Sequence, residues 1–218
     1  MNTQSLAKAF RRCAAVLGLL VAGGCGALLS PATPPPTIYS LAAAPGDSRT
    51  AAAQPRVPSD ALPSLVINPP RAAAGFGGPQ IIYVREPYRL EHFAHSEWVD
   101  TPARMLGPLI VAAIAGTGAF QAVVPAATGV VGSMRLDTEV LRLQQEFGGG
   151  PSRVRFTLRA YLLDITTRRV VAWREFDETV VSDSDDPYGG VVAANRAVQA
   201  VMHGLADFCA EAAHNARN

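Results

Sequence analysis

The segment RVRFTLRAYLLDI, residues 153–165, limits the possible folds more than any other part of the sequence. Its apolar and polar positions alternate, and successive side chains of a β-strand point to opposite faces of a sheet. The apolar side consists of Val154, Phe156, Leu158, Ala160 and Leu162. The other side consists of Arg153, Arg155, Thr157, Arg159 and Tyr161. The segment therefore predicts a strand of an antiparallel sheet that is packed on one face and wetter on the other.

Long strand-like segments precede and follow this one. MRLDTEVLRLQQEF occupies residues 134–147, and VVAWREFDETVV occupies residues 170–181. Glycine and proline at 148–151 and short polar residues at 166–169 fit hairpin turns between the three strands. Shorter strand-like segments are TIYSLAA at 37–43, SLVINPP at 64–70, the two halves of PQIIYVREPYRLEHF at 79–93, and GAFQAVV at 118–124.

Two segments have the apolar spacing of helices. DTPARMLGPLIVAAIA begins with a cap at Asp100 or Thr101, ahead of a proline in the first turn. The C-terminal helix follows SDSDDP, in which Asp186 is the expected cap. Its apolar stripe consists of Val191, Ala194, Val198, Val201, Met202, Leu205, Phe208, Cys209 and Ala212. The sequence thus predicts an α+β fold, a mostly antiparallel sheet with two main helices packed on one face.

Residues 1–24 have the composition of a secretory signal, with basic AKAFRR before the short apolar run CAAVLGLLVAGG. The last three residues of this run together with the next cysteine, Ala22-Gly23-Gly24-Cys25, resemble the lipobox of bacterial lipoproteins. This resemblance predicts that Cys25 becomes the mature N-terminus and carries an S-diacylglycerol and an N-acyl chain such as palmitate. Gly26 stands where an aspartate would favour the inner membrane, which predicts the periplasmic face of the outer membrane.

Three alternatives remain for this N-terminal segment. It is an ordinary signal peptide with an incidental cysteine, a membrane anchor that is retained, or a twin-arginine signal carrying Arg11-Arg12. A retained anchor is disfavoured because the apolar run is shorter than the roughly 20 residues that span a bilayer.

Proline content separates a tether from a domain. Ten of the 17 prolines lie between Pro31 and Pro70, and such low-complexity sequence does not form a packed core. We therefore predict a lipidated cysteine and proline-rich tether at 25–36 and a single domain at 37–214. A flexible Ala/Pro-rich excursion is expected at about 42–62.

The charge of the chain is nearly balanced, with 19 basic and 18 acidic residues. Three basic residues and no acidic ones precede Cys25, so the segment after it carries a small excess of negative charge. Nucleic-acid binding normally requires a basic surface. We therefore expect no nucleic-acid partner.

Few residues have the types or spacing of catalytic or metal sites. His92 and His95 lie near glutamates, but residues three apart on a strand point to opposite faces. Ser133, Asp137 and His203 do not form a recognisable triad pattern, and G-x-S-x-G is absent from the sequence. We expect no enzyme activity, no metal and no cofactor besides the covalent lipid on Cys25.

The stretch between Arg104 and Arg135 contains no formal charge. A transmembrane helix is one interpretation, but its prolines and glycines favour a buried helix, a loop and a strand in succession. We expect the loop part, residues 116–132, to be partly exposed and to contact a partner subunit or acyl chains. The candidate contact residues are Gly116, Phe120, Val124, Pro125 and Val130.

Arg153, Arg155 and Arg159 share the polar side of one strand. The favoured interpretation is a solvated face paired with nearby carboxylates. Contact with anionic lipid headgroups or with an acidic partner is the alternative.

The order of the motifs resembles the ABC-type transport auxiliary lipoprotein family. A lipobox is followed by Tyr39-Ser40-Leu41, then by Trp98 and Pro102 leading into a helix, then by long strands and an Ala-rich terminal helix. The resemblance extends from about Thr37 to Phe208. The family includes the outer-membrane lipoprotein partner of the paraquat-inducible system and of related transporters with mammalian-cell-entry (MCE) domains.

This resemblance implies a role in tethering. It implies docking of an MCE-domain protein and its ABC permease and ATPase to the outer membrane, for lipid transport between membranes. A homo-oligomer is expected by analogy with ring-shaped partners. The rival functions are a structural or assembly lipoprotein unconnected to a transporter, and an envelope hydrolase that uses His92 and Ser133.

Overall fold

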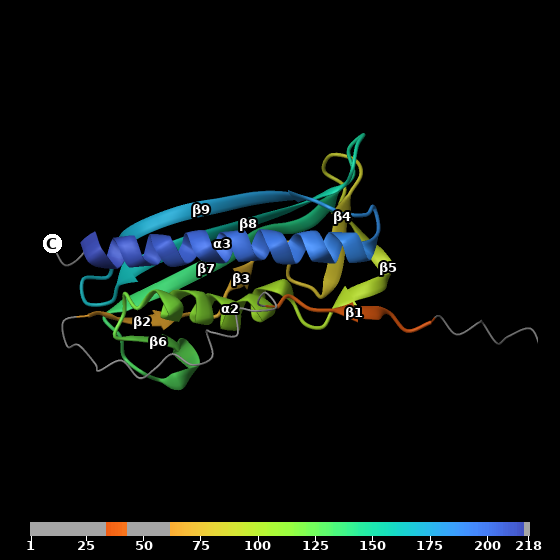
Figure 1. Ribbon diagram of the computed structural model, residues 1–218. Helices are drawn as coiled ribbons and strands as arrows, with labels where there is room; N and C mark the ends of the chain where they lie inside the picture. The colour runs from red at the N-terminus through yellow and green to blue at the C-terminus, as the bar shows by residue number, and fades with distance from the viewer. Residues whose placement is uncertain (1–33, 43–61, 216–218) are drawn as a thin grey trace, which may run out of the picture. The chain divides into compact units, whose positions relative to one another are not determined.

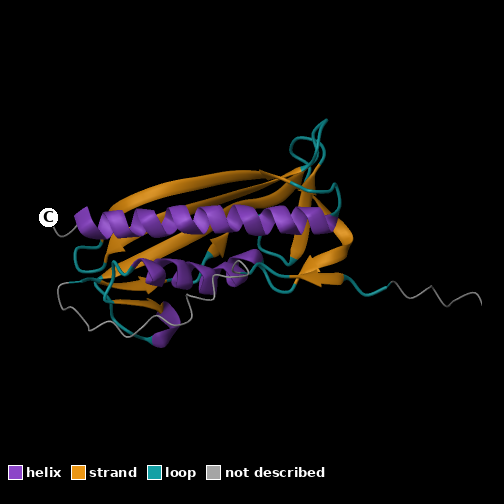
Figure 2. Ribbon diagram, viewed as in Figure 1, coloured by secondary structure: helices purple, strands orange, loops and turns teal. Residues whose placement is uncertain are grey.

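The computed structural model describes residues 34–42 and 62–215. These residues form an α+β fold, which confirms the predicted class (Figure 2). The helices are α2 (Pro102–Thr117), α3 (Pro187–Asn215) and the short 3-10 helix η2 (Ala126–Thr128). The signal, the lipobox with Cys25, most of the tether and most of the Ala/Pro-rich excursion lie outside the described residues.

A single nine-stranded sheet contains all of the described strands. In chain order they are β1 (Thr37–Tyr39), β2 (Ser64–Ile67), β3 (Arg71–Ala72), β4 (Gln80–Val84), β5 (Glu91–Trp98), β6 (Ala122–Pro125), β7 (Met134–Glu146), β8 (Arg153–Asp164) and β9 (Arg169–Val181). The three long strands form the predicted antiparallel hairpins β7–β8–β9. The glycine-rich turn at 148–151 links the first two strands.

The long strand pairs are antiparallel, as predicted, but short parallel pairs make the sheet mixed rather than purely antiparallel. The short strands β2, β3 and β4 succeed one another along the free edge of β7, and each runs parallel to it. They pair in turn with the beginning, middle and end of the same long strand. Because these segments follow one another in the same direction as β7, each pairs with it in parallel. None of them is joined to β7 by a hairpin turn, which would make the pair antiparallel.

Helix α3 covers the apolar side of the sheet, and α2 lies beside it (Figure 1). Phe156, Leu158 and Leu162 of β8 are fully buried, as are Leu205 and Cys209 of α3. The predicted alternation of β8 is confirmed, because its apolar positions form the core under the helix. Burial of this apolar area is the main favourable term of such a fold.

The predicted helix starts are confirmed in their geometry. The Thr101 side chain accepts a hydrogen bond from the Arg104 N–H at 3.4 Å at the start of α2. Asp186 Oδ1 accepts one from the Gly189 N–H at 2.7 Å at the start of α3. These bonds satisfy donors that a helix leaves unpaired in its first turn.

A buried polar contact joins the β7–β8 hairpin to the start of α3. Gln145 Nε2 donates to Ser152 Oγ at 2.9 Å, and the Ser152 N–H donates to Asp185 Oδ1 at 2.8 Å. A Cβ at Gly190 would lie 2.2 Å from Gln145 Oε1. Only glycine lets the helix approach the buried amide this closely.

The uncharged stretch forms most of α2, then β6, η2 and the loop before β7. The expected helix, strand and loop are all present, but the strand β6 comes before the loop and lies within the predicted loop part, 116–132. Across residues 34–42 and 62–215, no helix is long and apolar enough to cross a membrane.

The lone cysteine of the C-terminal helix is buried, as predicted. Burial raises the pKa of the Cys209 thiol to about 12. The thiolate is the reactive form of cysteine, so this side chain is unreactive at neutral pH.

The two sides of β8 should respond differently to truncation. Leu158→Ala is expected to lower the free energy of unfolding by about 2–5 kcal/mol, because it removes buried atoms and leaves a cavity. Arg153→Ala, on the exposed side of the same strand, should change it by about 0.5 kcal/mol or less. Urea unfolding followed by circular dichroism measures both values. Equal effects would contradict the assignment of the buried face.

Candidate docking surface on the open face of the sheet

The sheet face opposite the helices carries the polar side of β7, β8 and β9, and we call it the open face. Strand register aligns its side chains in rows across the three strands. From the β8–β9 turn to the β7–β8 turn, the rows are Arg135–Leu163–Val170, Asp137–Tyr161–Trp173, Glu139–Arg159–Glu175, Arg142–Thr157–Asp177, Gln144–Arg155–Thr179 and Glu146–Arg153–Val181.

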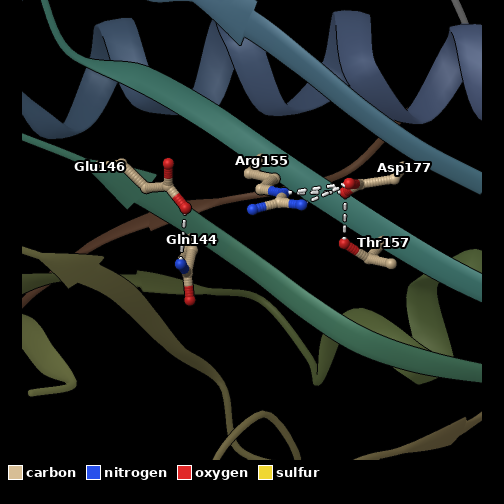
Figure 3. Close-up of polar contacts among 5 residues, drawn as sticks. All are labelled: Gln144, Glu146, Arg155, Thr157 and Asp177. Carbon is tan, nitrogen blue, oxygen red and sulfur yellow. Dashed lines mark hydrogen bonds and ion pairs between the residues drawn. The ribbon is translucent and has the colours of Figure 1, made fainter. Parts of the chain in front are cut away.

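Arg155 and Asp177 form the central ion pair of this face. Arg155 Nε donates to Asp177 Oδ1 at 2.9 Å, and Thr157 Oγ1 donates to the same oxygen at 2.7 Å (Figure 3). The Arg155 hydrogen bonds, helped by Thr157, lower the pKa of Asp177 to about 2. In the same view Gln144 donates to Glu146 at 2.8 Å.

The predicted arginine side is largely neutralised by carboxylates. Arg159 Nη2 donates to Glu175 at 2.9 Å, and the hydrogen bond raises the pKa of that arginine. Arg153 is exposed and has no ion pair among the described residues. The rows contain five arginines, at 135, 142, 153, 155 and 159, and five carboxylates, at 137, 139, 146, 175 and 177. This balance fits a solvated, paired face better than a general site for anionic headgroups.

An exposed apolar loop precedes β7, and we call residues 126–133 the valine loop. Val131 is 88% exposed and Val130 is 49% exposed. The end of the loop is held in place, because the Ser133 N–H donates to the Ser64 carbonyl at 3.1 Å. A Cβ at Gly132 would lie 2.8 Å from that carbonyl, so the backbones approach closely there. Two valines are thus displayed to solvent on an anchored backbone.

The other predicted contact residues of this stretch are divided between surface and core. Gly116, at the end of α2, and Pro125, at the end of β6, are exposed, and Val124 is half-buried. Phe120 is only 7% exposed and belongs to the core. Phe120 is therefore not an exposed contact residue as predicted, because its ring already packs in the core.

Sequence reasoning missed an aromatic cluster at one end of the open face. Tyr161 and Trp173 stack with centroids 6.3 Å apart, and Trp173 is 62% exposed. Leu163 and Val170 form the next row, and Val170 is 53% exposed. We call these four residues the aromatic end. The alternation of side chains along β9 could have predicted this cluster, because it places Trp173 on the polar side of the strand.

The residues considered for catalysis and metal binding are not brought together. His92 and His95 are both exposed on β5, and the described residues contain no group of three or more metal-ligating side chains. Asp137 lies on the open face and is paired with Arg135, whereas His203 is on α3, which packs on the other face. Ser133 hydrogen-bonds to Ser64. These positions do not form a nucleophile–base pair.

The described residues thus combine an exposed apolar loop with a sheet that has one packed face and one open face. The family model of the ABC-type transport auxiliary lipoprotein component matches residues 39–206, and the chain belongs to this family. This confirms the family resemblance noted from the sequence.

Solved structures share the fold. Protein XCC0632 from Xanthomonas campestris is 24% identical, with a TM-score of 0.68, covering 82% of this chain and 97% of that one. An uncharacterized protein is 14% identical, with a TM-score of 0.60, covering 80% of this chain and 99% of that one. No curated protein is significantly similar to the chain in sequence.

The Arg155–Asp177 pair gives stability a defined dependence on pH. The folded pKa of Asp177 lies below its ordinary value of 3.8, so its contribution is present above about pH 4 and lost as the pH falls towards 2. Asp177→Asn should reduce the free energy of unfolding at pH 7 by about 1 kcal/mol or less, because the pair is partly exposed.

Denaturant unfolding at pH 7, 4 and 2.5 measures this effect. The difference between the wild-type protein and Asp177→Asn should shrink as Asp177 becomes protonated. Asp207→Asn is the control, because this exposed aspartate on α3 has no ion pair among the described residues. A difference that stays constant down to pH 2.5 would exclude the proposed charge pairing.

Proposed function

We propose that this protein is the lipid-anchored periplasmic auxiliary subunit of an MCE-type ABC transport system, which it tethers to the outer membrane. The observation that carries the proposal is the family match over residues 39–206, because that family comprises auxiliary lipoproteins of ABC transport. The lipobox ending at Cys25 supports the anchor, and Gly26 supports the outer membrane. The transporter moves lipid, and this subunit contributes binding and placement rather than catalysis.

The partners in this proposal are an MCE-domain protein and the ABC permease and ATPase. The valine loop is the surface that docks them, because exposed valines on an anchored backbone bury apolar area on contact with little loss of loop entropy. The lipid on Cys25 fixes the other end of the chain in the membrane. Assembly of several copies stays a prediction.

The alternative is a structural or assembly lipoprotein of the outer membrane without a transporter. It uses the same anchor and the same exposed loop, and it differs only in the partner. The identity of the captured partner therefore separates the two functions.

Loss of the lipid should follow from one substitution. Cys25→Ser is expected to abolish acylation and to release the protein from the membrane fraction, since a hydroxyl does not replace the thiol in diacylglycerol transfer. Cys209→Ser is the matched control, because that thiol is buried. Intact-mass spectrometry and membrane fractionation measure the outcome. An unacylated wild-type mature N-terminus would remove the anchor from the proposal.

Charge in the valine loop should prevent docking. The double variant Val130→Asp and Val131→Asp is expected to lose at least about tenfold in captured transporter subunits, because docking would bury the new carboxylates. Val99→Asp is the control, since Val99 is 62% exposed but follows β5. Affinity capture from envelopes, with quantification of the MCE protein and permease, makes the measurement.

The same capture tests the rival function. Recovery of outer-membrane assembly proteins without any transporter subunit would favour the structural lipoprotein. Equal recovery of transporter subunits by the wild type and the loop variant would show that docking uses another surface.

A further inference from the structure

An open hollow of about 320 Å3 lies beside the first half of β7. It is lined by Asn68, Pro69, Arg71, Arg135, Asp137 and Thr138. The turn between β2 and β3 forms one wall, and β7 forms the other. Its volume is within the range of small-molecule sites in proteins.

The hollow contains more positive charge than its carboxylate neutralises. Asp137 Oδ1 accepts from Asn68 Nδ2 at 2.6 Å, and Asp137 Oδ2 accepts from Arg135 Nη2 at 3.1 Å. Both carboxylate oxygens are thus occupied. Arg135 Nε is buried without a hydrogen-bond partner, and Arg71 is exposed without an ion pair among the described residues. Two guanidinium groups with unused donors favour an anion with several acceptor oxygens.

The aromatic end adjoins this hollow through the strand register. Arg135 of the hollow is paired with Leu163, and Asp137 is paired with Tyr161. Trp173 follows in the same row as Tyr161 and stacks on it. An apolar and aromatic surface therefore continues directly from a cationic hollow, along one end of the open face.

We propose that this end of the open face binds a glycerophospholipid, with its phosphodiester between Arg71 and Arg135 and an acyl chain across the aromatic end. The charge of the hollow complements the phosphodiester. The exposed tryptophan and valine complement the hydrocarbon, which a free phosphate would leave uncovered. Tryptophan and tyrosine have the amphipathic character that favours the boundary between headgroup and acyl chain.

The bound lipid is the cargo of the transport system, and in this respect the inference rests on the proposed function. The binding itself is independent of the transporter and is measured without it. Lipid binding that persists while no transporter is captured would overturn the proposed function and leave this site standing. Transporter capture without lipid binding would overturn the lipid site and leave the proposed function standing.

The two tryptophans of the chain provide the readout. Trp173 is 62% exposed, whereas Trp98 is 4% exposed and already in an apolar environment. The full mature chain in a non-ionic detergent is titrated with dihexanoyl phosphatidylglycerol, and tryptophan emission is recorded. We expect a saturable blue shift that is absent in Trp173→Phe.

Three arginine variants test where the headgroup lies. Arg71→Gln and Arg135→Gln should each weaken binding about tenfold or more, because each removes charge-assisted hydrogen bonds to the phosphodiester. Arg153→Gln is the matched control, since this arginine is also exposed and without an ion pair on the open face, but at the opposite end. Its affinity should equal that of the wild type. Arg71→Gln is the decisive variant, because Arg71 has no ion pair in the described fold that its loss would break.

Two further ligands identify the chemistry. Dihexanoylglycerol, which lacks the phosphate, should not bind measurably, and glycerol 3-phosphate should bind much more weakly than the lipid. Equal binding of glycerol 3-phosphate and the lipid would overturn the lipid assignment. Unchanged affinity in Arg71→Gln, or equal weakening in all three arginine variants, would overturn the site.

Discussion

The packing of α3 on the apolar side of β8 organises the rest of the molecule. Phe156, Leu158 and Leu162 are buried under Leu205 and its neighbours on the helix. Because side chains alternate along a strand, this burial also determines which residues face away from the helices. A shift of one residue in the register would exchange the arginines and the core. The helical layer therefore creates the open face.

Along the open face, the balance of charge and apolar area changes from one end to the other. Towards the β7–β8 turn, Arg155 and Asp177 come from adjacent rows and neutralise each other as an ion pair, so this part of the face needs no ligand. Towards the β8–β9 turn, β8 and β9 carry the aromatic side chains Tyr161 and Trp173 in place of charged ones. Beside them, Arg135 Nε has no hydrogen-bond partner and Arg71 has no ion pair among the described residues. Partly exposed ion pairs contribute little to stability. A ligand would therefore gain the most binding free energy at the end near the β8–β9 turn, where donors and apolar side chains are not already paired.

The proposed activity combines three separate surfaces on one chain. In this proposal, a lipid on Cys25 would restrict the protein to a membrane, the valine loop would contact the transporter, and the hollow beside β7 would hold a phospholipid headgroup. The loop and the hollow both adjoin the beginning of β7, where the Ser133–Ser64 hydrogen bond and the Arg135–Asp137 pair fix the backbone and the side chains. Because both surfaces adjoin the start of the same strand, the proposed docking and lipid-binding sites lie near each other.

The sequence by itself determined the elements whose signals are local. The alternation of apolar and polar residues at 153–165 identified β8, and the capping residues Thr101 and Asp186 located the helix starts. The helical spacing of apolar residues correctly predicted that Cys209 is buried. The tertiary structure alone decided which strands run parallel to β7, because such pairing joins segments far apart in the chain. It also placed Phe120 in the core while leaving Val131 exposed. Arg71 and Arg135 share a hollow only because β3 and β7 pair across more than sixty residues, a distance over which no local pattern carries information.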